Sequence, residues 1–174
     1  GLLKIAAGGS EAAFAIRLIA DEPPKAAFTA APRRAVNGAL ELDYTLSDDH
    51  GIARAEAAIV PAGETAPDAR PLFDPPKYRL SLPRRSAEDN RATSSQDLTE
   101  HPLAGQKVRI TLVATDGAGQ QGRSETVETI LPGRSFTEPL AASLVEQRGV
   151  LALDANNLPR VFDLLDAMMI APEE

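Results

Sequence analysis

Apolar and polar side chains alternate along much of the first 133 residues. The cleanest run lies at residues 40–47, where Leu, Leu, Tyr and Leu alternate with Glu, Asp, Thr and Ser. Further runs with this period lie at residues 14–19, 53–60, 78–82, 108–114 and 127–131. A period of two is typical of a β-strand that buries one face. The pattern therefore predicts a strand at each of these places.

Proline and glycine separate the runs, in the segments DEPPK, APRR, DDHG, DPPK and DGAGQQG. No helical pattern intervenes as it would in a βαβ fold, and one apolar face per strand favours antiparallel pairing. We predict a mainly β protein with an antiparallel immunoglobulin- or fibronectin-like β-sandwich over residues 1–133. Residues 1–10 are a possible end of a preceding segment. Residues 62–76 and 84–97 are expected to be long loops.

The period changes after Gly133, and residues 134–174 are predicted to form a helical extension. Thr137 is a suitable N-cap for a first helix, and Asn157 can cap a second after the break at LDANN. The apolar positions of the first helix are Phe136, Leu140, Leu144 and Leu151. Those of the second are Leu158, Val161, Phe162, Leu165, Met168 and Met169.

The helical extension has two possible uses, which the sequence leaves open. Both helices can pack on the sandwich and complete its core. Alternatively they dock a protein partner or the remainder of the same polypeptide. The residues that would make this contact are Leu158, Phe162, Leu165, Met168 and Met169. The oligomeric state is not determined by these patterns.

Composition excludes several classes of function. The net charge of -7 argues against a nucleic-acid binder, which needs a basic face. The chain has no cysteine and only two histidines, so disulfides and thiolate metal sites are excluded and a zinc site is disfavoured. No apolar run approaches the roughly 20 residues that span a bilayer, so no direct membrane insertion is expected. Because the chain starts without Met, we expect it to be a segment of a longer protein.

The most reactive-looking stretch is SDDHG at residues 47–51. Asp side chains accept backbone N–H bonds in turns and Gly supplies positive φ, so the first interpretation is a turn between strands. The alternative is a Ca²⁺ site. In an immunoglobulin-like sandwich this loop shares one end with the loop after Asp116, so Asp48, Asp49 and Asp116 could together hold a cation. His50 adds little to such a site. No nucleophile elbow or phosphate-binding loop is present, so no catalytic residue and no other cofactor is predicted.

Two resemblances extend this interpretation. KVRITLVATDGAGQQGRSETVETILP resembles the last hairpin of bacterial immunoglobulin-like and fibronectin-like repeats. From residue 14 onward, segments such as LELDYTLSDDHGIARAEAAI, FDPPKYRLSLPRRSA and FTEPLAASLVEQRGVLALDANNLPRVFDLLDAMMIAPE together resemble a family of large alphaproteobacterial membrane proteins, described as a domain of unknown function. In that family, membrane-spanning helices precede an extracytoplasmic region. The resemblance implies a periplasmic segment of an inner-membrane protein, with no known activity and no catalytic residues to carry over.

Overall fold

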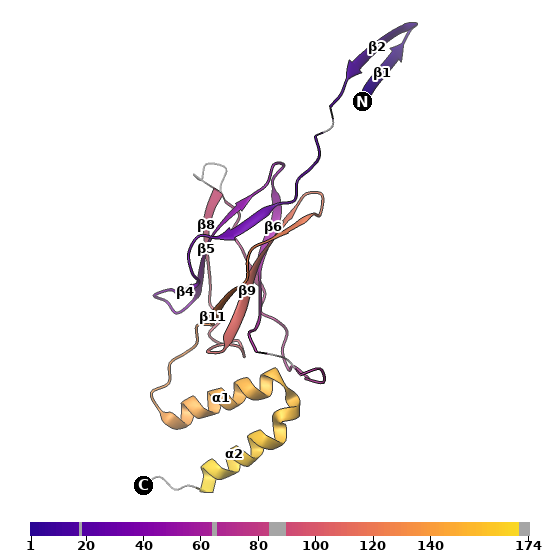
Figure 1. The fold of residues 1–174 in the computed structure, drawn as a ribbon. Helices are drawn as coiled ribbons and strands as arrows, with labels where there is room; N and C mark the ends of the chain where they lie inside the picture. Colours follow the sequence, from indigo (N-terminus) through magenta and orange to yellow (C-terminus); the bar gives the residue numbers. More distant parts are fainter. Residues whose placement is uncertain (18, 64–65, 84–89, 171–174) are drawn as a thin grey trace.

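The chain is mainly antiparallel β-structure with two C-terminal helices, as the sequence predicts. The computed structural model describes residues 1–17, 19–63, 66–83 and 90–170. Its strands form three sheets: a separate hairpin and two larger sheets that face each other. We call the part formed by the two larger sheets the two-sheet body. In Figure 1 the hairpin extends from one end of this body and the helices lie at the other.

The four-stranded sheet is built around β5 (Leu40–Ser47). One edge of β5 pairs with β8 (Arg91–Gln96). The other edge pairs in turn with β3 (Lys25–Phe28) and β4 (Arg33–Arg34). All of these pairings are antiparallel, and Arg33 joins Glu41 and Asp43 by ion pairs on the outer face.

The five-stranded sheet is built around β9 (Lys107–Asp116) and β6 (Ile52–Pro61), which pair along almost their whole length. The short β7 (Tyr78–Arg79) lies on the far edge of β6. β10 (Gln121–Arg123) and β11 (Val127–Ile130) follow each other along the far edge of β9.

Both central strands direct their even-numbered side chains into one shared core. Leu40, Leu42, Tyr44 and Leu46 of β5 are each at most 2% exposed. Val108, Ile110, Leu112 and Ala114 of β9 are each 0% exposed. The rows belong to one buried cluster, which also contains Ile59, Tyr78, Leu103 and Leu131. The period-two pattern thus gives the correct buried face for both strands.

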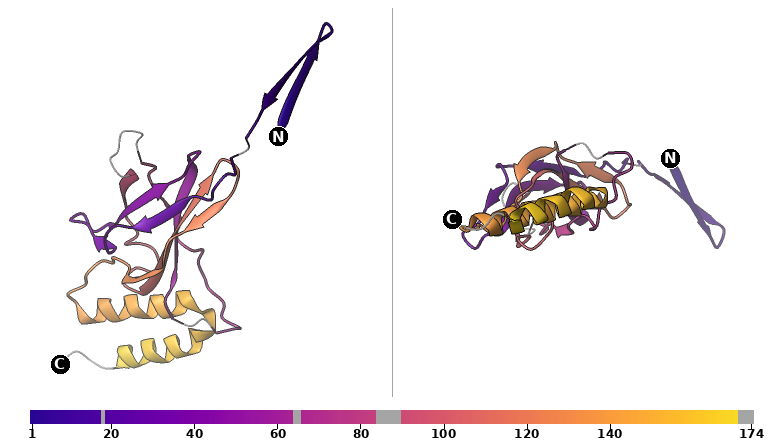
Figure 2. Two further views of the ribbon diagram at one scale, coloured as in Figure 1. Left: turned by 45° about the horizontal axis from the view of Figure 1, so that its top comes forward. Right: turned by 90° about the horizontal axis from the view of Figure 1, so that it is seen from below.

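The N-terminal hairpin forms its own two-stranded sheet, from β1 (Leu2–Ala7) and β2 (Ser10–Ala15). Gly8 and Gly9 form the two-residue turn, both with positive φ, which is the conformation that this kind of hairpin turn requires. The run of alternation at 14–19 is therefore not one strand, because β2 ends at Ala15. Figure 2 shows the hairpin clear of the two-sheet body from two further directions.

The C-terminal region contains α1 (Pro139–Leu153) and α2 (Leu158–Ile170), joined by a 3₁₀ turn (Ala155–Asn157). The predicted N-cap of α1 is wrong, because Glu138 rather than Thr137 occupies it, without a side-chain bond. Asn157 directly precedes α2 at the predicted position, and the Asp154 carboxylate caps the 3₁₀ turn before it. Among the described residues, no helix is long and apolar enough to cross a membrane.

The helices meet the two-sheet body at the junction between them. The Leu72 N–H donates to the carbonyl oxygen of Ala152, and the Arg70 N–H donates to the Asp154 carboxylate at 3.0 Å. Gly149 is buried because α1 passes so close to Gln106 that a Cβ there would meet its Nε2 at 2.7 Å. The end of α1 is thus attached to the body, while most of α2 lies farther from it (Figure 2).

The sequence-based interpretation of residues 84–97 as a loop is wrong at residues 91–96, which form β8. Residues 84–89 lie outside the described part of the chain. β8 carries Ser94 as its one deeply buried side chain, at 6% exposure, so it lacks the apolar alternation that marks the other long strands.

Candidate functional site

The candidate site lies where β5 turns into β6 and passes from one sheet to the other. One Asp48 carboxylate oxygen, Oδ2, accepts the backbone N–H groups of His50 at 3.0 Å and of Gly51 at 2.6 Å. Gly51 has a φ of +104°, which a side chain would strain. Asp48 therefore has the turn-forming role that its position in the sequence suggests.

Asp116 lies beside this turn at the end of β9. It is directly opposite Ile52 in the β6–β9 ladder. Its Oδ1 accepts the Gln120 N–H at 2.8 Å, which closes the loop into β10. The residue is only 3% exposed. The structure thus brings the predicted loops at Asp48 and Asp116 to one end of the two-sheet body.

Two carboxylate oxygens at this end are buried and unpaired. Within the described part of the chain, Asp48 Oδ1 and Asp116 Oδ2 have no hydrogen-bond partner and almost no solvent contact. Leaving a buried polar atom unpaired costs stability, more so when it belongs to a charged group. These two oxygens are the chemically unusual feature of the site.

Asp49 belongs to a different group of side chains. His50 Nδ1 lies 3.1 Å from Asp49 Oδ2 and 2.9 Å from Asp21 Oδ1. The three ligand atoms lie within 4.8 Å of one another, and all three residues are exposed. Gln120 joins Asp21 to the neighbouring loop through a bond from Nε2 to Oδ2 of 2.9 Å. The structure therefore places Asp49 with His50 and Asp21 in an outer cluster.

The outer cluster changes the protonation of its members. The hydrogen bond and charge of Asp49, followed by the charge of Asp21, raise the pKa of His50. For Asp49, partial desolvation raises the pKa, but bonds from its own backbone N–H and from His50 outweigh it and lower the pKa overall. The cluster thus favours an imidazolium between two carboxylates at mildly acidic pH.

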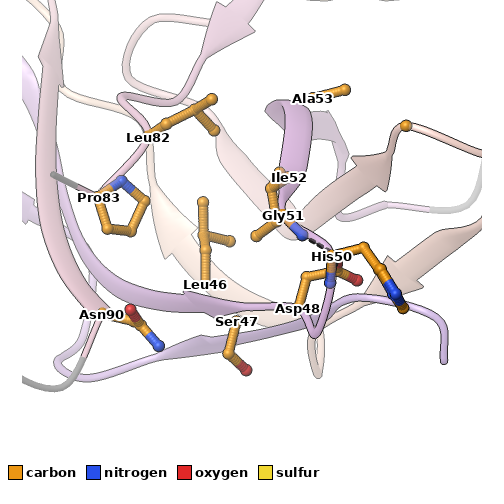
Figure 3. A pocket seen from close by; sticks show the side chains of 11 residues that line it. Leu46, Ser47, Asp48, His50, Gly51, Ile52, Ala53, Leu82, Pro83 and Asn90 are labelled. Carbon is orange, nitrogen blue, oxygen red and sulfur yellow. Dashed lines mark hydrogen bonds between the residues drawn. The ribbon is translucent and has the colours of Figure 1, made fainter. Parts of the chain in front are cut away.

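A surface pocket of about 450 Å³ opens on the inner side of the turn. Its apolar lining comes from Leu46, Ile52, Leu82 and Pro83, and its polar lining includes Ser47, Asp48 and Asn90. Figure 3 shows Asp48 below Ile52, with the His50 ring turned away from the apolar side chains. The pocket therefore adjoins the Asp48 turn, and His50 of the outer cluster also contributes to its lining.

Sequence reasoning missed two of these residues. Asp21 lies in DEPPK, which reads as a linker before β3, and its partner His50 was expected to add little. Only the tertiary path shows that residues 21–24 run along β10, where a Cβ on Gly122 would overlap the Pro24 carbonyl oxygen at 1.5 Å. No signal in the spacing of the residues indicates this approach.

The predicted partner-binding residues lie at the opposite end, on α2. Leu158 is 44% exposed and Phe162 is 56% exposed, while Leu165 is partly buried. Met168 and Met169 are in the helix, but their side chains lie outside what the structure describes. Val161 is buried, so one edge of the apolar stripe is covered and the other is open.

The entire chain matches a known protein family. The model of a domain of unknown function, DUF4175, matches residues 1–174. The chain belongs to the DUF4175 family. A comparison with curated proteins found no match for this DUF4175 chain.

Proposed function

We propose that this DUF4175 chain is a non-catalytic structural and protein-interaction module of a larger membrane-anchored envelope protein. The observation that carries the proposal is the placement of large exposed apolar side chains on both terminal elements. Contiguous apolar surface on a folded protein marks a place where something else binds. The surface is covered, in this proposal, by the remainder of the same polypeptide or by a protein partner.

The hairpin supplies the first apolar surface. Directly opposed residues of an antiparallel pair share a face, and Leu3 opposes Phe14 while Ile5 opposes Ala12. Leu3, Ile5 and Phe14 are 46%, 52% and 52% exposed. The other face carries the ion pair of Lys4 and Glu11, with 3.1 Å between Nζ and Oε1. Because an isolated two-stranded hairpin is at best marginally stable, its apolar face is expected to pack on something.

The helices supply the second apolar surface. Leu140 and Leu144 lie one turn apart on α1, and Leu158 and Phe162 lie one turn apart on α2. All four are between 44% and 56% exposed. Side chains four residues apart lie on one face of a helix, so each helix presents an apolar strip that the two-sheet body leaves uncovered.

We further propose that the two-sheet body, within residues 1–133, is an immunoglobulin- or fibronectin-like sandwich and that residues 134–174 are its helical extension. The strand pairing supports this. With β3, β5 and β8 as strands A, B and E, and β6, β9 and β10–β11 as strands C, F and G, each sheet has the neighbours that such a fold requires. The periplasmic location rests on the resemblance in the sequence.

Site-specific photo-crosslinking in the full-length protein tests the proposed function. A photoreactive phenylalanine analogue replaces Phe14 in one variant and Phe162 in another, and Val36 in a control. Val36 is a fully exposed apolar residue on the turn between β4 and β5, outside both terminal elements. Specific crosslinks from positions 14 and 162, mapped to the same polypeptide or to one partner, support the module. Crosslinking no greater than that from position 36 would contradict it.

A further inference from the structure

The two unpaired carboxylate oxygens carry an inference beyond the proposed function, and it begins with where they point. Asp116 continues the inward row Leu112, Ala114 of β9. Its partner across the ladder, Ile52, packs against the core, and opposed residues share a face. Asp116 is therefore directed between the two sheets and not toward solvent.

Asp48 approaches the same space from the other sheet. It lies just past the end of β5, two residues after the buried Leu46, and lines the pocket with Leu46 and Ile52. Its outer oxygen, Oδ2, is occupied by the turn N–H groups, which leaves Oδ1 as the buried, unpaired atom. Asp48 lies four positions before Ile52, and Ile52 is opposite Asp116 in the β6–β9 ladder. The two aspartates therefore approach from facing sheets at one end of the core.

Asp116 shows the same division of labour between its oxygens. Oδ1 accepts the Gln120 N–H, and Oδ2 has no partner in the described chain although the residue is 97% buried. Each aspartate thus uses one oxygen to build its loop and keeps the other free inside. A buried carboxylate oxygen without a partner costs stability, and a cation beside it would remove that cost.

We propose that Asp48 Oδ1 and Asp116 Oδ2 are ligands of a calcium ion bound at this end of the two-sheet body. Calcium takes six to eight oxygen ligands and combines carboxylates with backbone carbonyls and water, all of which loops at the mouth of a pocket can supply. Asp49 and Asp21 are already paired with His50 in the outer cluster. These two carboxylates therefore contribute negative electrostatic potential rather than ligands. Bound calcium would fix the β5–β6 and β9–β10 loops against each other.

Calorimetric titration and thermal unfolding of the whole 174-residue chain test this site. Calcium chloride is compared with magnesium chloride and with sodium chloride at equal ionic strength. The expected result is binding of one calcium and, at about 10 mM calcium, a Tm increase of about 5 °C, as for a site of sub-millimolar affinity. Magnesium should give a smaller increase because it loses its water shell reluctantly.

Asp116→Asn is the decisive variant, and Asp97→Asn is its matched control. Asp97 also accepts loop hydrogen bonds, from the N–H and hydroxyl of Thr99, but lies elsewhere. Asp116→Asn should lower calcium affinity at least tenfold, whereas Asp97→Asn should leave it unchanged. Should Asp116→Asn fold poorly, Asp48→Asn serves as the second variant, since its amide oxygen can still accept the turn N–H groups.

Two results would overturn the site. One is the absence of calorimetric calcium binding to the wild-type chain. The other is a calcium-dependent Tm increase that Asp116→Asn and Asp48→Asn both retain, or that sodium chloride reproduces. If Asp116→Asn raises the Tm without calcium and calcium has no effect on the wild type, the unpaired carboxylate destabilises the fold without binding a metal, and the calcium site is equally excluded.

Discussion

The Tyr78 hydroxyl group lies 2.7 Å from the carbonyl oxygen of Ser94, across the core of the two-sheet body. It also lies 3.0 Å from the carbonyl oxygen of Leu40. Tyr78 belongs to the edge of the five-stranded sheet, whereas Leu40 and Ser94 belong to the four-stranded sheet. The buried phenol of Tyr78 therefore links the two sheets by hydrogen bonds.

Removing this hydroxyl should weaken the body without changing its fold. We expect Tyr78→Phe to lower the free energy of unfolding by about 1–2 kcal/mol, the typical loss for a buried hydrogen bond. Urea unfolding followed by circular dichroism measures it. Thr126→Val is the control, because its hydroxyl bonds Thr111 at the surface and should contribute less. Equal losses in both variants would contradict the assigned role of Tyr78.

The same residue predicts how stability depends on alkaline pH. Burial, followed by the charges of Tyr44 and Glu41, raises the pKa of the Tyr78 phenol well above its usual range. The unfolded chain releases this proton near pH 10 and the folded chain keeps it, so stability falls as the pH rises above that value. We expect the decline between roughly pH 9.5 and 11 to be shallower in Tyr78→Phe. Parallel curves for the two proteins would argue against a buried neutral phenol.

Gly122 should not tolerate a side chain. A Cβ there would overlap the carbonyl oxygen of Pro24, which is backbone and cannot swing aside. We expect Gly122→Ala to cost about 3 kcal/mol and to displace residues 21–24 from β10. Gly63→Ala is the control, because no contact within 4 Å of its Cβ position is found among the described residues. A stability loss in Gly122→Ala no larger than in the control would mean that this segment does not lie against β10.

The pKa of His50 should lie above 6.5, the ordinary value for a histidine side chain. Because the folded pKa is raised, the stabilisation is fully present below pH 6.5 and is lost as the pH rises through the folded value. NMR titration of the imidazole measures the shift. Asp49→Asn and Asp21→Asn should each lower the pKa of His50, whereas Glu125→Gln, an exposed carboxylate outside the cluster, should not. If the pKa of His50 were unchanged in Asp49→Asn, the described interactions within the outer cluster would be contradicted.

The sequence predicts those strands in which the buried apolar residues recur with a regular period. β5 and β9 are found with their correct inward faces because apolar side chains recur at every second position, at residues 40–46 of β5 and 108–114 of β9. β8 is missed because RATSSQ is polar and is held by backbone pairing with β5 and by hydrogen bonds at Ser94. Local pattern cannot show that kind of stabilisation.

The candidate site follows the same division. The loops at Asp48 and Asp116 were expected to share one end because that follows from strand order alone. The pairing of Asp21 with His50 was not, because it depends on the path of a proline-containing linker past β10. The Asp154 cap of the 3₁₀ turn was not predicted for a related reason: Asp154 also accepts the Arg70 N–H, a tertiary contact that no local pattern shows.

The central claim of the proposed function is that the apolar surfaces of the hairpin and of the helices are both covered in the full-length protein. Since the 174-residue chain contains no cysteine, single cysteines at Phe14, Phe162 and the control position Val36 report accessibility without background in that chain, and the unsubstituted full-length protein gives the background rate for the full-length variants. The measurement is the rate of labelling by a membrane-impermeant maleimide, in the isolated 174-residue chain and in the full-length protein in intact spheroplasts.

All three positions should label rapidly in the isolated chain. In the full-length protein, positions 14 and 162 should label at least about tenfold more slowly while position 36 stays fast, because packing removes the first two from solvent. Equal, rapid labelling of all three positions in the full-length protein would show that both surfaces stay bare and would contradict the interaction module.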